Sequence, residues 1–126
     1  WSSANIHHID VAKFLAENNL FYGYGTYWNA GVISVLSGGK VLVRQVNLDE
    51  NISIPKPIKA HSSNEWYRKN NYQGQSFLLI TKNEEKYLNI EKLKELGINL
   101  VKKIYFKDFV IFIFSDNIST HLNWDN

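Results

Sequence analysis

A chain of 126 residues is long enough for a single domain over 1–126 and too short for two. Its formal net charge of +2, with basic residues scattered along the chain, argues against nucleic acid as a partner. The absence of cysteine excludes disulfides, cysteine metal ligands and a cysteine nucleophile. A hydrophobic content of 44% is enough for the domain to fold around its own core.

The first half of the chain predicts alternating helix and strand. Apolar residues recur at helical spacing over 6–18, and the short apolar segment 20–24 is typical of a strand. An alternating segment over 41–46 predicts a second strand. The segment that joins these two strands decides whether they run parallel.

This joining segment, 27–37, is open to two interpretations. Its apolar residues fit one face of a helix that Thr26 caps and that ends at Gly38, where a left-handed residue is needed. We favour this helix, which makes the flanking strands parallel through a crossover. The alternative is a β-hairpin in which Gly38 and Gly39 form the two-residue turn.

A long connection is predicted over 47–75. It contains both prolines of the chain, Pro55 and Pro57, and many polar residues, which are typical of loops. One helical turn is expected within it, around 64–67.

The last part of the chain predicts a strand, a short amphipathic helix that ends at Gly97, and a β-hairpin. The second strand of this hairpin is apolar at consecutive positions, which predicts a place inside the sheet with both faces covered. In chain order these elements cover 77–81, 88–96, 100–106 and 109–115.

The order of these elements predicts an α/β fold. We expect a layered sandwich with a mixed, mainly parallel sheet that ends in an antiparallel hairpin. The first strand–helix–strand crossover is expected to be parallel.

The turn Gly23-Tyr24-Gly25-Thr26 follows a predicted strand and opens a predicted helix, which is the context of a phosphate loop. The third glycine of a G-x-G-x-x-G motif would be residue 28, which is Trp28, and its bulk blocks the close backbone approach that the motif provides. A small nucleotide- or phosphate-binding enzyme domain that uses this turn is therefore the second functional hypothesis. The simpler interpretation is a tight turn in which glycine relieves crowding.

Aromatic residues gather at the same turn and on the long connection. Flat rings stack on the apolar faces of sugars, and neighbouring hydroxyl and amide groups bind sugar hydroxyls. These residues therefore predict a sugar-binding platform, unless the rings are core residues with satisfied polar groups. The candidate ligand-binding residues are Tyr24, Thr26, Tyr27, Trp28, Asn29, Trp66 and Tyr67, and the turn glycines are Gly23 and Gly25.

No catalytic or metal-binding pattern is present in the sequence. The adjacent His7 and His8 point to different sides of the predicted helix, and no zincin spacing, G-x-S-x-G turn or buried carboxylate pair occurs. We therefore nominate no catalytic residue, no metal ligand and no cofactor.

The chain begins at Trp1 and contains no methionine, so we expect it to be a fragment of a larger protein. Its longest apolar run, 109–114, is far too short to cross a bilayer as a helix. The fragment itself is therefore expected to be soluble.

The segment GYGTYWNAGVISVLSGGKV, at 23–41, resembles a Gly-Tyr-x-x-Tyr-Trp-x-Ala stretch that is followed by Ser-Gly-Gly and a strand. This pattern is similar to the soluble C-terminal domain of bacterial multi-spanning, mannosyltransferase-like membrane proteins related to glycosyltransferase 39. The segments VAKFLAENNL, at 11–20, and EWY, at 65–67, match as well. By position, Gly23, Tyr24, Tyr27, Trp28 and Asn29 carry the resemblance.

The resemblance implies an accessory domain on the extracytoplasmic side of the cell membrane. In that family catalysis lies in the membrane portion and uses a lipid-phosphate sugar donor, so no catalytic residue is implied here. The implied partners are a glycan or lipid-linked sugar, and the membrane through the spanning segments of the parent protein. A structural interaction domain with no ligand of its own is the plainest alternative.

Overall fold

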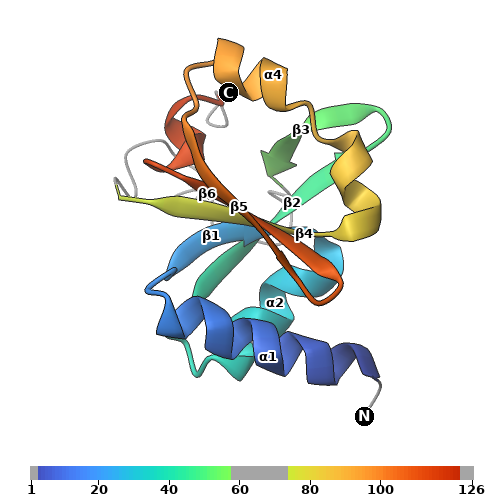
Figure 1. The fold of residues 1–126 in the computed structure, drawn as a ribbon, viewed down its shortest axis with the longest axis vertical. Coiled ribbons are helices and arrows are strands. Elements are labelled where there is room, and N and C mark those ends of the chain that lie inside the picture. The colour runs from blue at the N-terminus through green and yellow to red at the C-terminus, as the bar shows by residue number, and fades with distance from the viewer. Residues whose placement is uncertain (1–2, 58–73, 123–126) are drawn as a thin grey trace.

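The computed structural model describes residues 3–57 and 74–122, with the side chains of 3–6 and 27–29 outside the description. Within these ranges a six-stranded sheet in the order β3-β2-β1-β4-β6-β5 runs through the middle of the domain (Figure 1). The strands are β1 (Tyr22–Gly25), β2 (Leu42–Asp49), β3 (Ile52–Pro57), β4 (Ser76–Thr81), β5 (Leu100–Phe106) and β6 (Phe109–Phe114).

Helices cover both faces of this sheet, so the predicted α/β layered fold is confirmed. On one face lie α1 (Ser3–Glu17) and α2 (Tyr27–Leu36). On the other lie the 3₁₀ helix η2 (Lys82–Tyr87), α4 (Ile90–Glu95) and the 3₁₀ turn η3 (Ile118–Thr120).

The sheet is mixed, as predicted, and its parallel part lies at the centre. β1 runs parallel to both of its neighbours, β2 and β4. The pairs β2–β3, β4–β6 and β5–β6 are antiparallel, and the last of these is the predicted C-terminal hairpin. Parallel pairing is thus confined to the two contacts of β1 and does not extend through most of the sheet.

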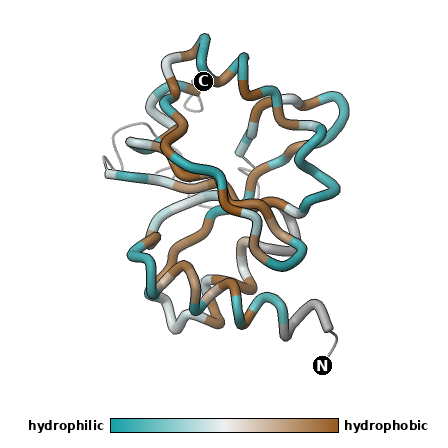
Figure 2. Tube along the Cα trace, in the orientation of Figure 1, coloured by the Kyte–Doolittle hydropathy of each residue, from teal (hydrophilic) through white to brown (hydrophobic). Residues whose placement is uncertain are grey.

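Two apolar cores lie on either side of the sheet, and β6 contributes to both. Val110, Phe112 and Phe114 belong to the core under α4, whereas Phe109 and Ile111 belong to the core under α1 and α2. This alternation confirms the prediction of a strand with both faces covered. In Figure 2 the apolar colouring concentrates in the central strands, and the polar colouring lies at turns and on α4.

The helix interpretation of 27–37 is confirmed, and the hairpin alternative is wrong. Thr26 is the N-cap residue of α2, with extended backbone angles of φ −73° and ψ 169°. Gly38, just after the helix, has a φ of +66°, the left-handed conformation that glycine adopts at little cost. The Thr26 hydroxyl makes no capping bond to α2, because it donates its hydrogen bond to the Glu84 carboxylate.

The prediction of an unstructured connection over 47–75 is wrong in its first part. β2 continues to Asp49, whose Oδ1 accepts hydrogen bonds from the amides of Asn51 and Ile52 and so closes a turn into β3. Pro55 and Pro57 lie in β3, which is an edge strand and therefore tolerates residues without an N–H group. The helical turn expected at 64–67 lies outside the described residues.

The helix predicted over 88–96 is shorter than expected, because η2 precedes it as a separate element. Asn89 is the N-cap of α4, and its Oδ1 accepts a hydrogen bond from the amide of Lys92. Gly97 has a φ of +88°, as expected for the residue that ends a helix.

Gly23 and Phe77 pack tightly against each other in the centre of the sheet. The two residues are direct partners in the parallel pair β1–β4, and the Phe77 ring is fully buried over the glycine. A Cβ built on Gly23 would lie 2.5 Å from carbons of that ring. Glycine therefore relieves crowding here, as the simpler interpretation expected, although the crowding comes from a neighbouring strand.

We expect Gly23→Ala to destabilise the domain by roughly 1–3 kcal/mol, because the buried ring must shift to admit a methyl group. Gly31→Ala is the matched control: it lies in α2 with open space around its Cβ position. That change should stabilise the helix by about 0.5–1 kcal/mol. Urea unfolding followed by circular dichroism measures both, and equal effects would contradict the packing argument.

Candidate functional site

The carboxyl ends of β1 and β4 form a topological switch point. The strands are parallel neighbours, yet β1 leads through α2 to β2 on one side, whereas β4 leads through η2 and α4 to the β5–β6 hairpin on the other. In open α/β sheets, ligands bind in the crevice outside the carboxyl ends at such a point. The predicted glycine turn lies at this place, since β1 ends at Gly25.

The Glu84 side chain occupies the switch point. Its Oε1 accepts hydrogen bonds from the Thr26 hydroxyl at 2.8 Å, from the Thr81 amide at 2.8 Å and from the Thr81 hydroxyl at 3.1 Å. Thr26 follows β1, and Thr81 ends β4, so one carboxyl oxygen joins both strands to the start of η2. Thr26 is only 5% exposed, and its hydroxyl is committed to this contact.

This arrangement argues against a phosphate at the glycine turn. An anion at the start of a helix is stabilised by the amide groups and the dipole of that helix. Here the Glu84 carboxylate contacts Thr26, the N-cap of α2, so a negative charge already lies beside that end. A phosphate would face like-charge repulsion in addition to the bulk of the residue at 28.

The expectation that Tyr24 presents ring surface to a sugar is wrong. Tyr24 is 2% exposed and packs in the core under α4. Its hydroxyl donates a hydrogen bond of 2.6 Å to Oδ1 of Asn117, which is itself buried. Because β1 is a central strand, its side chains point into the two cores, and Tyr24 is a core residue with a satisfied polar group.

The side chains of the five remaining predicted sugar-binding residues lie outside the part of the chain that the structure describes. Tyr27, Trp28 and Asn29 form the first turn of α2, beside the switch point, but their side chains are outside the description. Trp66 and Tyr67 lie outside the described residues altogether. A platform built from these five residues therefore stays a prediction.

A hollow that the sequence did not predict lies on the η2 and α4 side of the sheet. It is a wide, open depression in the surface with a volume of about 810 Å³. We call it the Tyr87 hollow, and its lining comes from the β2–β3 turn, from β3, from the end of η2 and from the start of α4. The lining residues are Glu50, Ser53, Lys86, Tyr87, Leu88, Asn89, Ile90 and Glu91.

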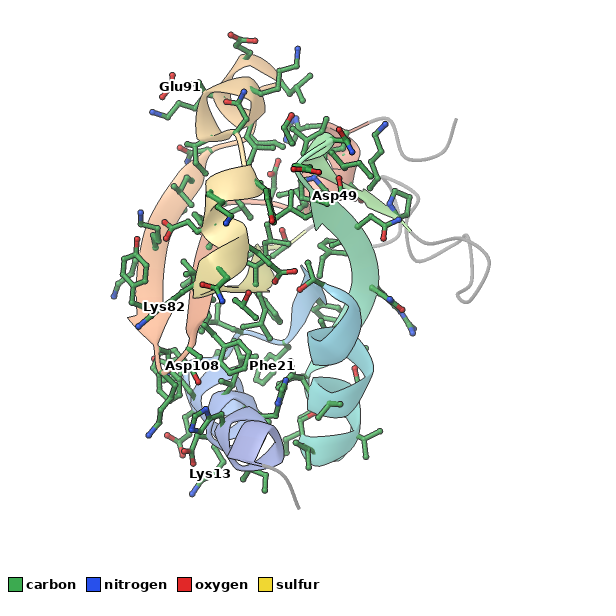
Figure 3. All side chains as sticks on the ribbon, turned by 90° about the vertical axis from the view of Figure 1, so that its right-hand side faces the viewer. Lys13, Phe21, Asp49, Lys82, Glu91 and Asp108 are labelled. Atoms are coloured by element: carbon green, nitrogen blue, oxygen red, sulfur yellow. The ribbon has the colours of Figure 1, made fainter. Side chains whose placement is uncertain are left out.

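The walls of the Tyr87 hollow are joined by backbone contacts. The Asn89 amide donates a hydrogen bond of 2.9 Å to the Ser53 carbonyl, which ties the η2–α4 connection to the edge strand β3. Tyr87 and Ile90 pack against the core beneath. Figure 3 views this side of the molecule, with Glu91 on α4 and Asp49 at the end of β2. The hollow is therefore held in shape by the fold itself.

The Tyr87 hollow combines an aromatic ring with polar groups of both kinds. The Lys86 ammonium lies 5.4 Å from the centre of the Tyr87 ring, and carboxylates come from Glu50 and Glu91. The side-chain amide of Asn89 caps α4 through its oxygen, so its NH₂ group can donate hydrogen bonds to a ligand. No local motif signals this site, since its two halves come together only through the β2–β3 hairpin.

Glu85, the residue of η2 that follows Glu84, bonds two side chains of the outer strand β5. The Glu85 carboxylate accepts hydrogen bonds from the Tyr105 hydroxyl at 2.8 Å and 3.0 Å and from the Lys103 ammonium at 3.0 Å. Desolvation alone would raise the Glu85 pKa, but these hydrogen bonds and the Lys103 charge outweigh it and lower the pKa below its ordinary value. The hydrogen bonds with Tyr105 and Glu85 raise the Lys103 pKa in turn.

No metal centre appears in the part of the chain that the structure describes, where no group of three or more histidine and acidic side chains comes together. Two of the histidines instead contact single carboxylates: His7 Nδ1 lies 2.8 Å from Asp108, and His121 Nε2 lies 2.9 Å from Asp116. Among residues 3–57 and 74–122, no helix is both long and apolar enough to cross a membrane.

Comparison of the chain with models of protein families, with curated proteins and with solved structures gives no significant match.

We expect Glu84→Ala to destabilise the domain by roughly 1–3 kcal/mol, because the buried Thr26 hydroxyl and the Thr81 amide lose their shared acceptor. Glu95→Ala on the exposed surface of α4 is the control and should change stability by less than about 0.5 kcal/mol. Urea unfolding compares the two variants. A Glu84 effect no larger than the control would show that the carboxylate is dispensable to the fold.

The Glu85 contacts predict a pH dependence. A carboxyl with a lowered folded-state pKa adds stability above its unfolded pKa and loses it as the pH falls through the lower folded value. Tyr105→Phe removes the hydroxyl donor, so the Glu85 pKa should move up towards its ordinary value. Carbon-detected NMR titration of the Glu85 carboxyl tests this, and an unchanged titration midpoint would contradict it.

Proposed function

We propose that this chain is a non-catalytic saccharide-binding domain and that the Tyr87 hollow is its binding site. The observation that carries the proposal is the combination of a half-buried aromatic ring with amide, hydroxyl and carboxylate groups in one preformed hollow. Sugar rings present apolar faces for stacking and hydroxyls for hydrogen bonds, and they need both kinds of partner.

The charges of the hollow favour a neutral or amino-bearing sugar over a phosphate. The lining has two carboxylates, Glu50 and Glu91, and one ammonium, Lys86, and Glu91 also forms an ion pair of 3.5 Å with Lys94 of α4. Carboxylates accept hydrogen bonds from sugar hydroxyls and attract amino groups, whereas they repel phosphate. A glycan part of a lipid-linked sugar fits this lining better than its phosphate does.

A non-catalytic role is supported by how the polar groups at the switch point are used. Thr26, Thr81 and Glu84 bind one another, and Tyr24 is bound to Asn117, so these groups stabilise the fold. The resemblance of 23–41 to extracytoplasmic domains of mannosyltransferase-like membrane proteins supports the wider setting. We propose that the domain lies outside the cytoplasm on such a membrane protein and positions a glycan for it.

Titration of the ¹⁵N-labelled chain with a panel of neutral, amino and acidic oligosaccharides tests the site. We expect shifts in the amide signals of Ser53, Tyr87 and Asn89 with neutral or amino sugars. Tyr87→Leu keeps apolar packing but removes the ring, and should weaken binding about five- to tenfold, the effect of losing one stacking contact. Phe21→Leu, which alters a partly exposed ring outside the hollow, is the control and should leave the affinity unchanged.

Shifts confined to the first turn of α2 would move the binding site to the predicted platform and contradict the Tyr87 hollow. The absence of shifts across the whole panel would contradict saccharide binding by the domain.

A further inference from the structure

The two edge strands of the sheet differ in how well their outward backbone groups are protected. Edge strands expose backbone N–H and C=O groups that can pair with another strand, so proteins protect them with prolines, charges or covering segments. The outer strands here are β3 and β5. Only one of the two carries strong protection in the part of the chain that is described.

The edge of β3 is closed. Pro55 and Pro57 remove two backbone donors from this strand. The Ser53 carbonyl accepts its hydrogen bond from the Asn89 amide, which places the η2–α4 connection along the edge. A further strand cannot add here without displacing that connection.

In the part of the chain that the structure describes, no strand pairs with the outer edge of β5, which we call the open edge. The strand runs for seven residues, from Leu100 to Phe106, without proline or glycine. It pairs with β6 across the short turn at Lys107 and Asp108, with Phe106 opposite Phe109 and Ile104 opposite Ile111. In such a hairpin alternate residues bond the partner strand, so Lys103 and Tyr105 direct their backbone groups away from β6.

Exposed side chains with restricted conformations lie on this open edge. Tyr105 is 54% exposed and is fixed by its hydrogen bonds to Glu85. The Lys103 ammonium lies 5.1 Å from the centre of the Tyr105 ring. Val101, which is 56% exposed, adds apolar surface near the start of the strand. An exposed aromatic ring with restricted freedom costs little conformational entropy on binding.

The charge of β5 indicates the kind of partner. The strand carries Lys102 and Lys103 and no acidic residue. Because their positions alternate, the two lysines lie on opposite faces of the strand. Lys102 has no ion-pair partner among the described residues, whereas Lys103 pairs with Glu85. Cross-strand pairs of opposite charge stabilise a sheet, and like charges destabilise it.

We infer that the open edge of β5 binds an extended acidic segment of a partner protein by strand addition. The partner strand bonds the backbone of Lys103 and Tyr105, and its carboxylates lie on the face of Lys102, the lysine that has no ion pair among the described residues. A second copy of this chain is a poorer occupant, because two β5 strands bring four lysines of like charge onto one ribbon. This inference is independent of saccharide binding, since it concerns a different strand.

Hydrogen exchange of the ¹⁵N-labelled chain tests the inference with three capped peptides of matched length. One alternates glutamate and valine, one alternates lysine and valine, and one is the glutamate peptide with prolines in place of its valines. We expect only the first to slow exchange of the Lys103 and Tyr105 amides, with no change in β3. Equal protection by the lysine peptide, or none by the glutamate peptide, would overturn the inference.

A matched pair of variants separates backbone pairing from charge. Lys103→Thr and Lys103→Pro both remove the ammonium, but only proline removes the outward N–H group. We expect Lys103→Pro to bind the glutamate peptide about fivefold more weakly than Lys103→Thr, the effect of one lost hydrogen bond. Equal affinities would contradict strand addition.

Circular dichroism checks the fold of both variants, and the exchange result on the unaltered chain decides the question if the proline variant does not fold. Protection of β5 that grows with protein concentration and needs no peptide would assign the edge to a second copy instead.

Discussion

The contact that joins the two central parallel strands to η2 is the one that the Glu84 carboxylate makes with Thr26 and Thr81. It joins the end of β1, the start of α2, the end of β4 and the start of η2 at a single oxygen atom. The direction in which η2 leaves the sheet is set there. Both surfaces to which we assign binding roles are built on the residues of η2 that follow.

Along η2, successive side chains contact different parts of the sheet. Glu84 points to the switch point, Glu85 holds Tyr105 on the outer strand β5, and Lys86 and Tyr87 line the hollow beside β3. A short 3₁₀ helix has three residues per turn, so neighbouring side chains point in clearly different directions. One element therefore links the centre of the sheet to both of its edges, which lie at opposite ends of the strand order.

The fold also shows why the usual ligand position of an α/β sheet is closed in this domain. A switch point offers amide groups and an open crevice, but here a carboxylate and two threonines satisfy one another. Closure of this position strengthens the scaffold. The Tyr87 hollow and the β5 edge, to which we assign binding roles, both lie away from this position, and Tyr87 also packs against the core.

The sequence determined by itself the elements whose signals are local. Apolar residues at consecutive positions in β6 require cover on both faces, and Gly38 and Gly97 end their helices because only glycine adopts the left-handed conformation cheaply. Only the tertiary structure decided the place of Pro55 and Pro57, since a proline belongs to a strand or to a loop according to whether that strand lies at an edge. It also decided that Tyr24 is buried and that Tyr87 lines a hollow, because exposure depends on what the rest of the chain packs against each ring.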